Sequence, residues 1–162
     1  MAVSIMGLST LGITFGYGVE TVAGQKPATF IQLERINNIG GISMDTEQID
    51  ASALEDLVTK YIAGRQDTGG TWNVTFNFTP ETEEQWQDAI DAYNTAKQAS
   101  LNTWFEVIVP NQSNAFFVIA EFPQEIPMPE IGQNELLTVE VGLSIVEYKG
   151  MSAKVPFAGT SA

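Results

Sequence analysis

Carboxylates are the side chains of this sequence with the most obvious chemical potential. A glycoside hydrolase needs two of them at a fixed distance across a sugar, and a calcium loop needs oxygen ligands in a set order. Neither pattern can be read here, and 20 Asp and Glu residues among 162 positions make short clusters expected by chance. We therefore interpret the clusters as a solvated face and as charges that favour a helix start. They are Asp45, Glu47 and Asp50, and Glu81, Glu83 and Glu84.

Two residue types that are central to enzyme chemistry do not occur in the sequence. Without His, a Ser-His triad, an imidazole base and most zinc sites are excluded, and without Cys there is no thiolate chemistry or disulfide framework. The Gly-rich stretch GRQDTGG lacks the Lys-Ser/Thr pair of a phosphate-binding loop. We expect a protein that is not an enzyme and needs no cofactor or metal, and a carboxylate-only hydrolase is the weakest alternative.

The charge balance argues against nucleic-acid binding. The net charge is −13, and the seven Lys and Arg residues are scattered rather than grouped into a patch that would neutralise phosphates. No apolar run approaches the roughly 20 residues of a membrane span, so we expect no membrane insertion. The first positive charge is Lys26, too late for the basic start of a secretory signal, and we expect a soluble intracellular chain.

Alternating apolar residues predict a mainly β fold, an antiparallel β-sandwich or barrel with one packed helix, in a single domain over residues 1–162. Strands are expected over 11–19, 71–78 and 135–148. Two hairpins are expected, one joining 29–36 to 41–49 and one joining 103–109 to 115–122. The tail over about 150–162 is small and polar, which predicts a flexible or partner-bound segment.

One helix is predicted over about 80–99. Thr79 suits the N-cap and Pro80 the first helical position. Apolar residues then recur at helical spacing and form one stripe that should lie against a sheet. The stripe consists of Trp86, Ala89, Ile90, Tyr93 and Ala96.

The segment over about 51–70 is predicted to be a long loop that contacts other copies of the same protein. Its apolar residues would be costly in water if the protein stayed alone; a short helix packed on the chain's own core is the alternative. A second apolar face at Trp104, Ile108 and Phe117 also suggests subunit contact. The apolar residues of the loop are Leu54, Leu57, Val58, Tyr61 and Ile62.

From Asp50 to Trp86 the sequence resembles the major tail tube proteins of long-tailed bacteriophages, whose fold is shared with type VI secretion tubes. The matching positions are Gly64, Asp67, Gly69 or Gly70, the strand from Trp72 to Phe78, and Pro80, which precedes an acidic amphipathic helix. The ending FPQEIPMPEIGQNELLTVEVGLSIVEYKG is similar to the family's return through a loop into a long final strand.

This resemblance implies hexameric rings stacked into a hollow tube through which viral DNA passes without specific binding. The loop would reach neighbouring subunits and the adjacent ring, and polar strand faces would line the lumen. The implied partners are further copies and tail proteins such as the tip or initiator, the tape measure and the terminator. The implied location is the virion tail, with assembly in the host cytoplasm. The implied loop contacts are Leu54, Leu57, Val58, Tyr61, Ile62, Arg65 and Asp67, and the candidate lumen residues are Thr71, Asn73, Thr75, Asn77, Thr138, Glu140 and Ser144.

A monomeric β-sandwich that binds other molecules, such as glycans, is the main alternative. Exposed tryptophans stack well on sugar rings, and the chain has Trp72, Trp86 and Trp104. Trp72 and Trp86 fall on faces predicted to be buried, so core packing is favoured for both.

Overall fold

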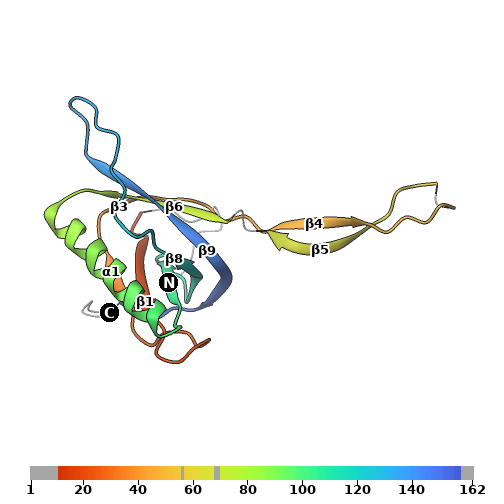
Figure 1. Cartoon of the computed structure of the whole chain (residues 1–162), viewed down its shortest axis with the longest axis horizontal. Helices are drawn as coiled ribbons and strands as arrows, with labels where there is room; N and C mark the ends of the chain where they lie inside the picture. Colours follow the sequence, from red (N-terminus) through yellow and green to blue (C-terminus); the bar gives the residue numbers. More distant parts are fainter. Residues whose placement is uncertain (1–10, 56, 68–69, 158–162) are drawn as a thin grey trace.

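A computed structural model describes residues 11–55, 57–67 and 70–157 of the chain (Figure 1). The side chains of residues 64–67 are outside this description. The elements are β1 (Thr14–Val19), β2 (Ile31–Leu33), β3 (Ile36–Ile39), β4 (Asp45–Asp50), β5 (Tyr61–Asp67), β6 (Thr71–Asn77), α1 (Pro80–Gln98), β7 (Thr103–Ile108), β8 (Asn114–Glu121) and β9 (Thr138–Ala153). The mainly β class with one helix is as predicted.

The main sheet has seven antiparallel strands in the order β2-β1-β7-β8-β9-β6-β3. Strands β1 and β6 are not neighbours in this order, yet the rings of Phe15 and Trp72 lie 5.6 Å apart, edge to face. The sheet therefore curls so that its two halves pack on each other across one core, as in a β-sandwich. The predicted hairpin of β7 with β8 is confirmed.

Strand β6 shows why the sequence folds this way. Trp72, Val74 and Phe76 are buried, while the residues between them are exposed or half-buried. This alternation places one face of the strand on the core and leaves a polar face outside. Each residue of β6 pairs with a residue of β9, from Thr71 opposite Ser144 to Asn77 opposite Thr138.

Helix α1 begins with a reciprocal cap. The hydroxyl of Thr79 accepts a hydrogen bond from the Thr82 backbone N–H at 3.2 Å, and the Thr79 N–H donates to the Thr82 hydroxyl at 2.8 Å. The predicted stripe is buried, and Trp86 stacks on Phe76 at 4.8 Å between ring centroids. In the described part of the chain, no helix is both long and apolar enough to cross a membrane.

A second apolar cluster covers the opposite face of the sheet near β7 and β8. Two expectations are corrected here. The residues near Trp104 are not free for subunit contact, because the chain's own C-terminal segment covers them. The expectation of a flexible or partner-bound tail over about 150–162 also needs correction for its first part. Strand β9 continues to Ala153, and Phe157 is only 5% exposed. The cluster consists of Phe30, Trp104, Ala115, Phe117, Ile119 and Phe157, with Ile108 and Val155 at its margin.

The predicted hairpin between 29–36 and 41–49 is wrong. Strand β2 pairs with β1, β3 pairs with β6, and β4 pairs with β5 in a separate two-stranded sheet. The predicted long loop is therefore in part a strand: β5 covers Tyr61–Asp67 and pairs with β4 to form a β-hairpin. The strand expected over 41–49 exists in part as β4, but its residues are exposed on both faces, so no burial pattern indicated which strand it pairs with. Figure 1 shows this hairpin projecting far from the body of the molecule.

Candidate assembly surfaces

The β4–β5 hairpin carries large apolar side chains into solvent. Leu54 and Leu57 are fully exposed, and Val58 is 73% exposed. Lower on the hairpin, Ile49 and Ile62 face each other across the strands and are both about half exposed. Such side chains cost free energy in water, so the tip of the hairpin is a candidate interaction surface.

Hydrogen bonds hold the end of the hairpin next to its tip. The Ser52 N–H donates to the Asp50 carboxylate at 2.9 Å, and the Lys60 N–H donates to the Ser52 hydroxyl at 2.6 Å. The backbone and side-chain hydrogen bonds from Ser52 hold the pKa of the Asp50 carboxyl below its ordinary value. These hydrogen bonds join the two sides of the hairpin just below its tip. Arg65 and Asp67 lie on β5, but their side chains are outside the described part of the structure.

The polar residues singled out in the sequence form one continuous face. Thr71 pairs with Ser144, Asn73 with Gly142, Thr75 with Glu140 and Asn77 with Thr138, so register brings both strands' polar side chains to the same side. The amide of Asn37 donates to the Asn77 side-chain oxygen at 3.0 Å and extends this face to β3. The face is exposed or half-buried, uncharged over most of its length, and opposite to the core.

An acidic hollow adjoins one end of the polar face. It has a volume of 460 Å³, and the loop between β8 and β9 forms its other wall. Three carboxylates line it, yet the described residues contain no group of three or more His, Cys, Asp or Glu placed to share a metal ion. The lining residues are Thr75, Met128, Pro129, Glu130, Glu135, Thr138 and Glu140.

The carboxylate clusters of the sequence form no catalytic arrangement among the described residues. Glu81 and Glu83 lie in the first turn of α1, where the helix dipole favours acids. Asp45, Glu47 and Asp50 are exposed on β4. The clusters therefore match their interpretation as solvated and helix-start charges.

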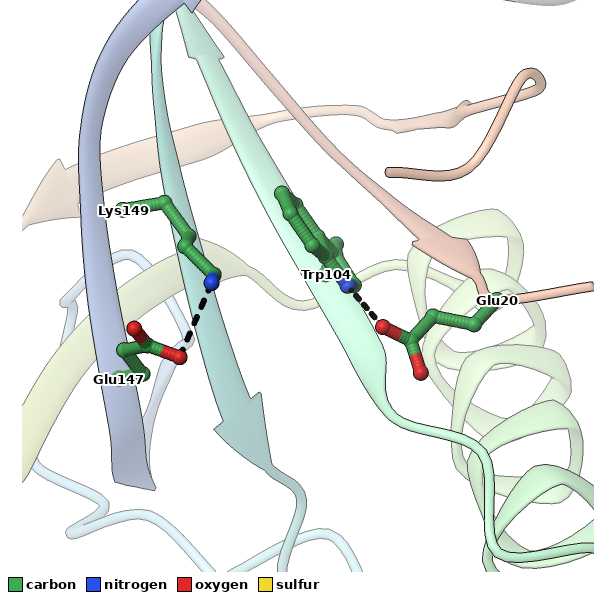
Figure 2. A network of polar contacts seen from close by, with 4 residues as sticks. All are labelled: Glu20, Trp104, Glu147 and Lys149. Atoms are coloured by element: carbon green, nitrogen blue, oxygen red, sulfur yellow. Dashed lines mark hydrogen bonds and ion pairs between the residues drawn. The ribbon is translucent and has the colours of Figure 1, made fainter. Parts of the chain in front are cut away.

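Two buried carboxylates were missed in the sequence, and both hold the second apolar cluster in place. Glu20 accepts hydrogen bonds from the Trp104 indole N–H and the Asn102 N–H, both at 2.8 Å. Figure 2 shows Trp104 between Glu20 and Lys149; the Lys149 ammonium lies 5.6 Å from the Trp104 ring centroid and 3.0 Å from Glu147.

Glu106, the other buried carboxylate, is fully enclosed under the C-terminal segment. One of its oxygens accepts a hydrogen bond from the Val155 N–H at 2.7 Å, and the other has no hydrogen-bond partner among the described residues. Burial raises the pKa of the Glu106 carboxyl. The sequence did hold a signal for this buried carboxylate: a Glu within the apolar strand TWFEVIV predicts a polar contact on the second face of that strand.

The β-sandwich fold, the exposed apolar hairpin and the polar strand face are features of a structural protein. A family model described as "Phage tail tube protein, TTP" matches residues 1–154. The chain therefore belongs to the phage tail tube protein family, and its role is structural, in a phage tail tube. The predicted resemblance is confirmed. No curated protein matches the chain.

Two solved structures are similar to the chain. One is described as the tail of an empty GTA particle in C6 symmetry, with a TM-score of 0.56 and 13% identity over 91% of this chain and 99% of that chain. The other is described as an anti-feeding prophage baseplate, 6-fold symmetrised, with a TM-score of 0.49 and 11% identity over 94% of this chain and 98% of that chain. At such low identity, the first similarity supports the fold alone.

Proposed function

We propose that the whole chain acts as one tail-tube domain that assembles into hexameric rings, stacked as a hollow tube through which viral DNA passes. The observation that carries this proposal is the projecting hairpin, whose apolar tip is exposed and is covered by none of the residues that the structure describes. The six-fold symmetry described for the similar GTA tail supports the ring number. Assembly takes place in the host cytoplasm, with the tip, tape measure and terminator proteins as further partners.

Apolar burial is the driving force for assembly. Fully burying one Leu or Val side chain contributes about 1.5–3 kcal/mol, so Leu54, Leu57 and Val58 together supply a substantial association energy. The net charge of −13 on each copy opposes close packing, and salt screens this repulsion.

The polar face of β6 and β9 lines the lumen in this proposal. Its Thr and Asn side chains and the carboxylate of Glu140 offer DNA no cation to bind, so a polyanion slides past them. The acidic hollow beside this face adds further negative charge at one end. The mechanism is passive conduction through a wall that does not adhere to phosphate.

Negative-stain electron microscopy with light scattering over a concentration series tests the proposal. Hollow tubes or six-fold rings are the expected result, and a chain that stays monomeric throughout would argue against it. The alternative of a glycan-binding module loses its main support, because Trp72, Trp86 and Trp104 are all buried.

A further inference from the structure

The residues that the structure describes cover the inner face of the curled sheet only in part. Helix α1 packs over β1 and β2. Farther along the same face, beyond the helix, a groove of 280 Å³ remains open between the strands and the segment that leads from β3 into β4. Apolar side chains dominate its lining, chiefly Ile39, Ile42, Trp72, Val107, Phe116 and Tyr148.

The rim of the groove is rigid where it meets β6. The Trp72 indole N–H donates to the Gly40 carbonyl at 2.6 Å, and a Cβ at Gly40 would lie 2.8 Å from the Asn73 carbonyl oxygen. At Gly41, the next residue, no atom of the described residues would lie within 4 Å of an added Cβ. The groove is thus preformed, with one close-packed edge and one open edge.

We infer that this groove receives the hairpin tip of a second copy, with Leu54 or Leu57 seated in it. This inference rests on the proposed tube assembly and names the surface that the tip contacts. A dry cavity of about 150 Å³ accommodates benzene, so 280 Å³ has room for one or two apolar side chains. Fully exposed Leu side chains and an open apolar groove are complementary surfaces on the same chain.

The tip is held away from its own groove. The groove lies at the base of the hairpin, and β4 alone, six residues at roughly 3.3 Å each, carries the chain about 20 Å outward. Figure 1 shows the hairpin extending away from the sheet rather than folding back on it. The contact is therefore between copies. Because the two surfaces differ, it is head-to-tail and propagates into closed rings or a helical stack.

Cross-linking tests the contact directly, because the natural chain has no Cys. The double variant Gly41→Cys/Leu57→Cys is assembled and treated with a short bis-maleimide. A second double variant, Gly41→Cys/Leu54→Cys, is treated in the same way. The expected result is a ladder of covalent dimers, trimers and larger species on a denaturing gel. Gly41→Cys alone should give no ladder.

A groove variant provides a second readout. Gly41→Glu places a charge at the open edge without a clash, and it should raise the concentration needed for assembly by about tenfold or more, because a carboxylate would lose water in an apolar contact. Asn94→Asp, on the exposed side of α1, adds the same charge and should leave assembly unchanged. Equal melting temperatures show that both variants fold.

The outcomes separate this inference from the tube proposal. Tubes that form without any ladder, and with Gly41→Glu assembling normally, overturn the groove as the docking site and leave the tube intact. A cross-link between Gly41→Cys and Ile5→Cys in such tubes assigns the groove to the N-terminal segment instead, which also overturns the inference. A chain that never assembles overturns both proposals.

Discussion

Thr75 lies directly opposite Glu140 in the antiparallel pair of β6 and β9, and both side chains belong to the sheet face that turns away from the core. Both also line the acidic hollow beside the loop between β8 and β9. This pairing places a carboxylate within the otherwise uncharged polar face, toward the end where the hollow lies. It gives the proposed lumen a residue whose accessibility can be measured.

Assembly should shield position 140 from large reagents. In Glu140→Cys, the free subunit reacts with both a small maleimide and a bulky polymer-linked one, whereas the assembled tube reacts with the small reagent only, because the bore excludes the polymer. Glu84→Cys, exposed on α1, is the matched control. If the polymer-linked maleimide labels position 140 in tubes but no longer labels position 84, the polar face lies on the outside of the tube and the proposal is contradicted.

Charge at the hairpin tip should prevent assembly without unfolding the subunit. Leu57→Asp removes the burial of one Leu, about 1.5–3 kcal/mol, and should raise the assembly concentration by roughly 10- to 100-fold. Tyr61→Asp, lower on β5, should act in the same direction. Sedimentation measures assembly, and circular dichroism checks the fold. Unfolding of Tyr61→Asp would show instead that Tyr61 supports the intrachain core.

Phe157 should matter for stability although it lies in a small, polar tail. Its ring fills a site directly above Gly16, where a Cβ would overlap the ring. Phe157→Ala should lower the free energy of unfolding by about 3–5 kcal/mol, as for other buried aromatic rings. Urea denaturation measures this, and Pro156→Ala, at an exposed neighbouring position, is the control. Unchanged unfolding in Phe157→Ala would mean that the tail does not cover the second cluster in solution.

Glu106 should make the subunit less stable as the pH rises. Its pKa is raised by burial, so the folded state holds its proton to higher pH than the unfolded state does. Its contribution is fully present below the ordinary pKa near 4.5 and is lost as the pH rises through the raised value.

The variant Glu106→Gln isolates this effect. It keeps an oxygen that can accept from the Val155 N–H, carries no charge, and should be more stable than the natural protein at pH 7, with the difference shrinking toward pH 4. Thermal melting across this range measures it. A constant difference at every pH would show that Glu106 is not the titrating group.

Local pattern was enough to predict β6, the β7–β8 hairpin and α1. Trp72 and Phe76 alternate with polar residues, and Thr79-Pro80 is a strong helix start. A strand was expected over 41–49, but the pairing of β4 with β5 could not be predicted, because DTEQID has no buried face that would fix its neighbour. The cover over Trp104 depends on Phe157, more than 50 residues away, and such a contact leaves no local pattern in one sequence.

The candidate surfaces were predictable only where a local sequence pattern forms them. The polar face follows from strand period and register, so Thr71 to Asn77 and Thr138 to Ser144 could be named in advance. The groove beside Trp72 could not, because it depends on where α1 stops covering the curled sheet. The exposed tip at Leu54 and Leu57 was visible as apolar residues in a polar setting.

The central claim is that copies of this chain build a tube. Negative-stain electron microscopy of the purified protein, over a concentration series at low and high salt, tests it most directly. The account predicts hollow tubes of uniform width with six-fold end views, favoured by salt because the net charge of −13 is screened. A particle that remains a 17.6 kDa monomer at every concentration, even with preformed tail ends added as seeds, would contradict it.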